Sequence, residues 1–251
     1  MNRILSLIMD IGEQMLLSGA EVSRVEESIR RMSCAFGAQR SDVFIITSNM
    51  EVTLKDNAGA TYTQTRRILG IDTDIERLHH LNALARKISS GDMSLETAEK
   101  ELLRVLHIRR YPALLNILSY ALISGAFTVF FGGGAAECLC ALAVGVVLAL
   151  IIKLTEAGHL NKIFAKFFCS FVGVLLAFTA LRIGLVPSVD AIIIGFIMTL
   201  IPGVGLTVAL RDLFVGDSIS GVLRTIEAVL FAFAIAGGYF LAAFIMGGGA
   251  V

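Results

Sequence analysis

The alternation of apolar and polar positions divides this chain into an amphipathic first part and a second part of long apolar runs. Apolar residues spaced by three and four positions predict helices over residues 4–15 and 22–36. The apolar run 43–47 predicts a buried strand, and strict alternation over 50–55 predicts a half-exposed strand. The β-favouring residues of 61–67 predict a third strand, so the first part combines helices with a sheet.

Helical periodicity returns after Asp72 and continues to the end of the first part. Apolar positions over 75–88 predict one helix, which Gly91 would end, and Ser94 would begin another. Together these elements predict an α+β domain over residues 1–108, which is long enough to bury a core of its own.

The second part, residues 109–251, carries apolar runs of the length that crosses a membrane. About twenty residues of helix are needed to cross roughly 30 Å of hydrocarbon. We therefore expect an all-α membrane domain of about five transmembrane helices, embedded in the lipid bilayer, after the cytoplasmic α+β domain. The expected spans are residues 112–131, 135–153, 165–183, 188–208 and 223–246.

Charged residues follow the same division of the chain. Of the 21 basic and 21 acidic residues, fifteen of each lie in residues 1–110, although 56% of the whole chain is apolar. The formal net charge is zero, so the chain has no electrostatic footprint for nucleic acid, and we expect none as a partner. Asp10 and Glu13 interrupt the first apolar run, which a cleavable signal peptide would not tolerate. The first domain is therefore expected to stay in the cytoplasm.

The distribution of Lys and Arg predicts an orientation in the cell (inner) membrane. Cytoplasmic loops of membrane proteins are enriched in these residues. Most of the positive charge lies in the stretch before the first span and in or beside the segments 154–164 and 210–222, whereas the opposite side has only Arg182. We therefore expect a multi-pass protein with a cytoplasmic amino terminus and a carboxyl terminus outside.

Ionisable residues inside or beside the last two apolar runs are the main candidates for function. They follow a Pro-Gly pair, and charged groups at hydrocarbon depth usually face a bundle interior or an aqueous cavity. One interpretation is a discontinuous helix, in which Arg211 or Arg224 binds a substrate carboxylate and Glu227 carries a coupling proton. The other is an ordinary cytoplasmic loop with solvated charges. The candidate pathway residues are Pro202, Gly203, Arg211, Asp212, Asp217, Arg224 and Glu227.

The first domain has polar candidates of its own, the N-terminal motif residues Ser18, Glu21, Arg24 and Glu26. Ser18 and Glu21 have the spacing of a capping box, which would begin the second helix. A membrane-tethered hydrolase with its site in residues 1–107 is one alternative function, and a non-transporting scaffold subunit is another. No nucleophile elbow, Walker loop or dinucleotide motif occurs in the sequence, so we expect no catalytic residues, no metal and no cofactor.

These residues resemble the threonine/serine exporter family, and in particular its split form, over nearly the whole chain. In the first domain the resemblance rests on Gly12, the segment L-L-S-G-A-E at 16–21, Arg24-Val25-Glu26, Arg66 and Ile71-Asp72. In the membrane part it rests on Ile201-Pro202-Gly203, Leu210-Arg211-Asp212-Leu213, Gly216-Asp217, Ser220-Gly221, Arg224 and Glu227-Ala228.

The resemblance implies a secondary transporter subunit, and no enzyme, that exports small carboxylate-bearing metabolites such as threonine, serine or the dicarboxylate succinate. It also implies a partner, because in split members this longer subunit pairs with a second small membrane subunit of the same family. An odd number of spans without an internal repeat points the same way, since many transporters are built from two related halves.

Overall fold

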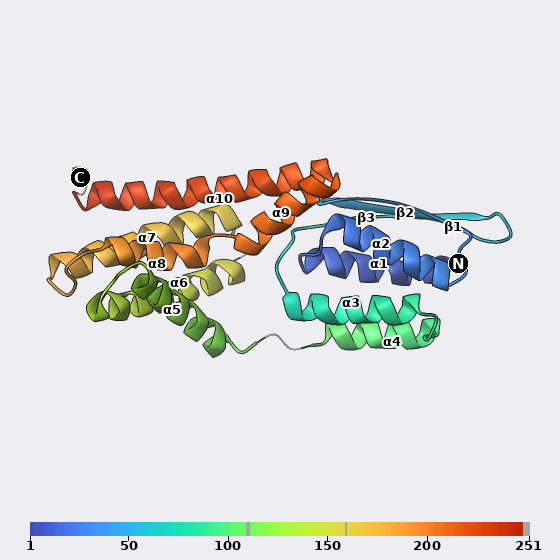
Figure 1. The fold of residues 1–251 in the computed structure, drawn as a ribbon, viewed down its shortest axis with the longest axis horizontal. Helices are drawn as coiled ribbons and strands as arrows, with labels where there is room; N and C mark the ends of the chain where they lie inside the picture. Colours follow the sequence, from blue (N-terminus) through green and yellow to red (C-terminus); the bar gives the residue numbers. More distant parts are fainter. Residues whose placement is uncertain (109–110, 159, 248–251) are drawn as a thin grey trace. The chain divides into compact units, whose positions relative to one another are not determined.

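A computed structural model of the chain is mostly helical, with a small three-stranded sheet near the amino terminus (Figure 1). The expected combination of helices with a sheet in the first part of the chain is thereby confirmed. The structure describes residues 1–108, 111–158 and 160–247.

The chain forms two compact units, and each joins segments that are far apart in the sequence. The first consists of Met1–Arg109 with Gly203–Ile226, and the second of Arg110–Pro202 with Glu227–Val251. The boundary expected between the two domains falls at Arg109-Arg110, outside the described residues, and stays a prediction.

The amino-terminal elements of the first unit are α1 (Asn2–Leu17), α2 (Val22–Ala35), β1 (Arg40–Ile46), β2 (Asn49–Lys55), β3 (Thr61–Arg67), α3 (Ile75–Ser89) and α4 (Leu95–Leu106). The strands pair antiparallel in the order β1-β2-β3, with Val52 of β2 opposite Val43 and Gln64. Helices α1 and α2 cover one face of the sheet, and α3 and α4 pack on the side of these helices away from it (Figure 1).

Alternation along β2 explains how the sheet joins the core. Met50, Val52 and Leu54 are fully buried against the helices, while the residues between them face away. This confirms the half-exposed strand expected from the sequence. The expectation of a buried first strand is wrong. Phe44 of β1 is 58% exposed, because it lies on the face of the sheet that the helices leave uncovered, as does the exposed Glu51 opposite it on β2.

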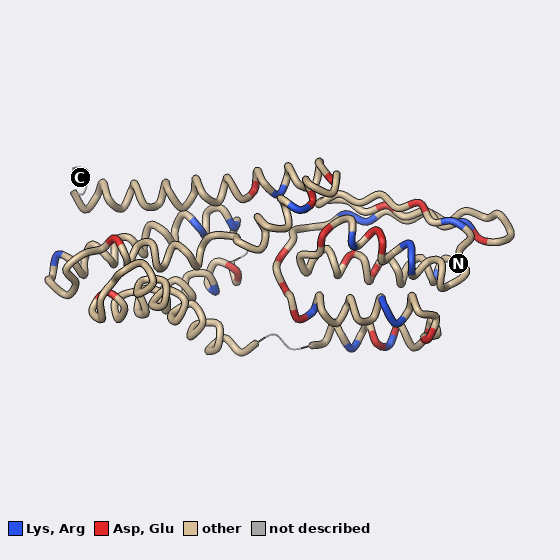
Figure 2. The backbone as a smooth tube through the Cα atoms, in the orientation of Figure 1, with Lys and Arg blue, Asp and Glu red and all other residues tan. Residues whose placement is uncertain are grey.

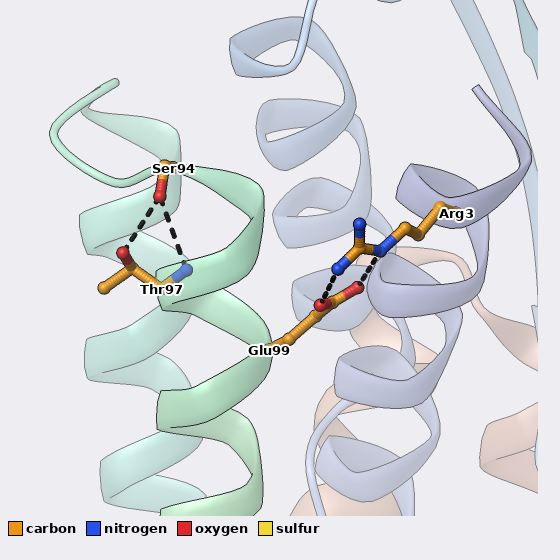
Figure 3. A network of polar contacts seen from close by, with 4 residues as sticks. All are labelled: Arg3, Ser94, Thr97 and Glu99. Carbon is orange, nitrogen blue, oxygen red and sulfur yellow. Dashed lines mark hydrogen bonds and ion pairs between the residues drawn. The ribbon is translucent and has the colours of Figure 1, made fainter.

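Helix α4 has a side-chain cap and an ion pair with α1 (Figure 3). Ser94 accepts a hydrogen bond from the Thr97 backbone N–H, so this helix begins where its sequence predicts. The Arg3 guanidinium donates two hydrogen bonds to the Glu99 carboxylate, at 2.8 and 2.6 Å. Both side chains are partly exposed, so the pair fixes the relative orientation of the two helices more than it stabilises them.

The second unit contains α5 (Ala113–Phe130), α6 (Ala135–Ala157), α7 (Lys162–Arg182), α8 (Asp190–Leu200) and most of α10 (Ser218–Ile245). Glycines let these helices approach one another closely. An added Cβ at Gly145 of α6 would meet the Tyr120 carbonyl oxygen of α5 at 2.6 Å. One at Gly195 of α8 would meet the Ser124 carbonyl oxygen at 2.7 Å. Small residues at helix crossings are typical of packing in membranes.

Among the described residues, four helices are long and apolar enough to cross a membrane: α5, α6, α7 and α10. A fifth span results if α8 and α9 (Gly203–Val215) count together as one broken span. Helix α8 alone has 11 residues, which is about 16 Å and too short to cross the hydrocarbon. Charged residues are frequent along α1–α4 and sparse along α5–α8 (Figure 2).

Candidate functional site

The turn between α1 and α2 holds the N-terminal motif in a fixed shape. Gly19 takes a φ of +91°, which residues with a side chain rarely adopt, and an added Cβ there would lie 2.9 Å from the Asp72 carbonyl oxygen. The Asp74 backbone N–H donates to the Ser18 carbonyl at 3.2 Å. Asp72 bonds to the Leu17 carbonyl in the same way, so the chain before α3 fastens this turn from outside.

The expected capping box does not form, and that prediction is wrong. Ser18 lies at the end of α1 and is buried, while Glu21 directly precedes the first residue of α2. The Glu21 side chain makes no capping hydrogen bond. Because Gly19 turns the chain before α2 begins, Ser18 is too far back to cap that helix. The Glu21 carboxylate is thus available to another part of the chain.

Residues 203–226 form a helical hairpin within the same compact unit. Its two helices, α9 and the start of α10, are separated by Gly216, with a φ of +102°, and Asp217. The segment 210–222 is helical apart from this turn. Both interpretations of its charges, a binding site in a discontinuous helix and ordinary solvated groups, stay predictions. Gly221 lets the hairpin close, since an added Cβ there would lie 2.6 Å from a leucine side chain of α9.

Two arginines of the hairpin contact the turn between α1 and α2. Arg211 Nη1 lies 2.8 Å from Glu21 Oε1. Arg224 Nη2 donates to the Ala20 carbonyl oxygen at 3.0 Å. The Glu21 side chain is 14% exposed and that of Arg211 is 62% exposed, so much of the Arg211 guanidinium stays accessible. The structure thus places the N-terminal motif beside candidate pathway residues that are far away in the sequence.

Asp212 and Arg224 form a buried ion pair inside the hairpin. Arg224 Nε lies 3.4 Å from Asp212 Oδ2, and the two side chains are 8% and 0% exposed. Both carboxylate oxygens of Asp212 are buried. The charges of Asp217 and Glu21 and the backbone N–H of Val22 act on this carboxylate electrostatically. Because an isolated charge in a protein interior is costly, the ionised form of Asp212 depends on Arg224.

Other candidate residues lie elsewhere. Pro202 and Glu227 belong to the second unit, and Glu227 is exposed on α10. Glu26 has a structural role, since its carboxylate accepts the Ile45 backbone N–H at 3.2 Å and so links α2 to β1. Arg24 is exposed on α2. The group that the structure does bring together, called the turn–hairpin cluster below, consists of Ala20, Glu21, Arg211, Asp212, Asp217 and Arg224.

Asp10 and Glu13, two residues outside the candidate set, form a second charged cluster. Arg66 of β3 donates to Glu13 at 2.8 Å, and also to Asp10 and to the Ser6 carbonyl. Partial burial works to lower the pKa of Arg66, but the bonds to Glu13 and Asp10 outweigh it and raise this pKa above its ordinary value. The spacing of Asp10 and Glu13 places both on one face of α1, which the sequence does show. The sequence around Asp10 and Glu13 does not indicate that their partner is Arg66 on a distant strand.

A groove of about 320 Å³ lies between α1 and α4. Its charged groups are held in ion pairs, Arg3 with Glu99 and Asp10 with Arg66. Ser6 supplies a hydroxyl, but no histidine is among the residues described as lining the groove. A serine needs an adjacent base to act as a nucleophile, and these lining residues show no serine–histidine pair.

The chain matches the family model of threonine/serine exporters over residues 6–246. A threonine/serine exporter of Corynebacterium glutamicum is 26% identical over 247 residues, which cover 94% of this chain and 50% of that protein. The chain therefore spans about half the length of this curated relative. No solved structure matches the chain.

Proposed function

Because the chain belongs to the threonine/serine exporter family, we propose that it is a subunit of a membrane exporter for small carboxylate-bearing metabolites. Membership of a family of exporters supports a transport function and not an enzymatic one. The observation that carries the proposal is the pair of arginines in the turn–hairpin cluster. Arg211 lies in α9, which follows the break after α8, and Arg224 lies near the start of the candidate span α10.

The proposed substrates are threonine, serine or succinate, which all carry a carboxylate. A guanidinium can bind a carboxylate through two parallel N–H bonds. Arg211 is suited to this role because much of its side chain is exposed, whereas Arg224 is buried and engaged by Ala20 and Asp212. We therefore assign the substrate carboxylate to Arg211 and a supporting role to Arg224. The name of the Corynebacterium relative favours the two amino acids among these substrates.

Glu227 is the proposed proton-coupling group. It follows Arg224 by three positions on α10, so that both residues belong to one side of that helix. It also lies within an apolar run, where an ionisable side chain is uncommon and often belongs to an ion or proton pathway. Glu227→Gln should abolish the proton dependence of export at normal membrane abundance. An unchanged proton dependence would remove Glu227 from the mechanism.

A second small membrane subunit of the same family is the proposed partner. The Corynebacterium relative is about twice as long as this chain, so it contains as much sequence again. Expression of this chain alone should leave metabolite efflux at background, and addition of the short subunit should raise it. Full efflux from liposomes that contain only the purified chain would contradict this requirement.

The proposed orientation in the inner membrane is a cytoplasmic amino terminus and an external carboxyl terminus. If α8 and α9 form one broken span, the five spans place the two ends of the chain on opposite sides. Four spans would place them on the same side. Alkaline phosphatase fused after residue 247 should therefore be active, and a fluorescent protein fused there should be dark. The reverse pattern would mean that α8 and α9 form a re-entrant loop.

The proposed function is tested by transport into everted membrane vesicles, whose cytoplasmic face is outside. Vesicles come from cells that make the chain and from cells in which its gene has been deleted, so any native partner is present in both. Uptake of labelled threonine, serine and succinate is then compared. Faster uptake of at least one of them with the chain present supports the exporter. Equal uptake of all three would favour the scaffold or the tethered hydrolase.

A further inference from the structure

We propose that Glu21 is a gating residue, whose carboxylate occupies the Arg211 guanidinium in competition with the carboxylate of the exported solute. This inference rests on the proposed function, which assigns the solute carboxylate to Arg211. It adds a role for the N-terminal domain, namely that its α1–α2 turn controls access to the cation that binds the solute.

The geometry of the pair allows such a competition. Glu21 Oε1 contacts Arg211 Nη1 at 2.8 Å, with one oxygen on one nitrogen. An arginine has five N–H donors, and its guanidinium can donate hydrogen bonds to both oxygens of one carboxylate. Since the Arg211 side chain is 62% exposed, donors remain open to a second carboxylate while Glu21 is still in place. A solute that engages the fork at two points can therefore displace the single contact of Glu21.

When a solute displaces Glu21 from Arg211, only these two side chains need to move, because the backbone around them is held in place. The turn that carries Glu21 is held by Gly19 and by the backbone bonds from the segment before α3. Arg224 binds the Ala20 carbonyl and is paired with Asp212, so the hairpin stays attached to the turn when Arg211 is released. Opening the gate thus requires a change of side-chain rotamer and no unfolding of the cluster.

A purely structural ion pair is the competing explanation, and it predicts opposite effects. If the pair only fastens the hairpin to the turn, its loss should leave solute affinity unchanged or weaken it. If Glu21 competes with the solute, removal of its charge should strengthen apparent affinity. Exposed ion pairs are weak, so we expect the half-saturating solute concentration to fall by about two- to fivefold.

The experiment measures uptake of labelled threonine, serine and succinate by everted vesicles, from cells in which each variant replaces the chromosomal copy. Glu21→Gln keeps the size of the side chain and removes its charge. Glu27→Gln is the matched control, because Glu27 lies on α2, the helix that follows Glu21, and pairs with Arg31 on the exposed surface. We expect a lower half-saturating concentration for Glu21→Gln and a wild-type value for Glu27→Gln, at equal membrane abundance.

A charge exchange, Glu21→Arg with Arg211→Glu, restores an ion pair but puts a glutamate where the solute carboxylate is assigned, so we expect no uptake. Recovery of uptake by this exchange would overturn both the assignment of the solute to Arg211 and the gate. An unchanged or raised half-saturating concentration in Glu21→Gln would overturn the gate alone. Failure of the proposed function differs from this, since none of the three solutes would then enter wild-type vesicles faster than vesicles that lack the chain.

Discussion

The Arg211 guanidinium lies 2.8 Å from the Glu21 carboxylate, so two motifs that are far apart in the sequence meet at one turn. One motif closes the connection between α1 and α2, and the other forms the hairpin of α9 and α10. The contact joins the turn before α2 to α9, the second helix of the bent pair α8 and α9. It is the basis of the gate proposed for Glu21.

Loss of Arg224 should destabilise the protein more than loss of the whole buried pair. Arg224→Met leaves the Asp212 carboxylate buried without its partner, which typically costs about 3–5 kcal/mol. The double variant Arg224→Met with Asp212→Leu replaces both charges by apolar groups and should recover part of this loss. Urea unfolding of the purified full chain in detergent, followed by circular dichroism, measures both effects. Additive losses in the double variant would show that the two charges are not coupled.

Gly19→Ala should destabilise the turn for two reasons, its positive φ and the approach of the Asp72 carbonyl. A strained backbone conformation of this kind costs about 1–3 kcal/mol. Gly37→Ala is the matched control, because Gly37 has a φ of +84° but open space around an added Cβ. The unfolding free energy should therefore fall further for Gly19→Ala than for Gly37→Ala. Equal losses would mean that the contact with Asp72 contributes nothing.

Stability should depend on pH through the pair of Arg3 and Glu99. The hydrogen bond from Arg3 lowers the pKa of the Glu99 carboxyl below its ordinary value of 4.5. A carboxyl with a lower pKa in the folded state adds stability above its unfolded pKa and loses it as the pH falls through the folded pKa. Wild type should therefore melt higher than Arg3→Gln at pH 7, and the difference should shrink below pH 4.5.

The control for this titration is Lys100→Gln, which removes a positive charge from an exposed position of α4. The melting difference between wild type and this variant should not follow the same pH course. If Arg3→Gln and Lys100→Gln behave alike, the effect belongs to overall charge and not to the bonded pair.

Local periodicity was enough to predict the elements whose shape is decided by their own residues. Strand β2 follows from alternation, because each second side chain enters the core, and α4 begins at Ser94 because a serine caps its own helix. The break between α8 and α9 was also predictable, since Pro202 cannot donate a helical hydrogen bond. Each of these signals lies within a few residues of the feature that it predicts.

Features that depend on distant neighbours could not be predicted in this way. Phe44 lies in a run that is apolar enough for a buried strand, but it is exposed because the helices cover only the other face of the sheet. Glu21 has the spacing of a capping residue, yet its partner is Arg211 on another element. The ten residues after Leu210 are polar enough for a loop, but they are helical apart from Gly216 and Asp217, and Arg211 contacts the α1–α2 turn.

The most direct test of the central claim is solute uptake by everted vesicles that carry Arg211→Lys. Lysine keeps the positive charge that faces Glu21 but cannot bind a carboxylate through two parallel N–H bonds. Arg224 is less suitable for this test, because it is buried against Asp212 and its replacement would also affect folding. Arg31→Lys on α2 is the matched control. We predict that Arg211→Lys lowers uptake of the transported solute at least about tenfold at normal abundance, while Arg31→Lys has no effect. Wild-type uptake by Arg211→Lys would contradict the assignment of the solute carboxylate to this site.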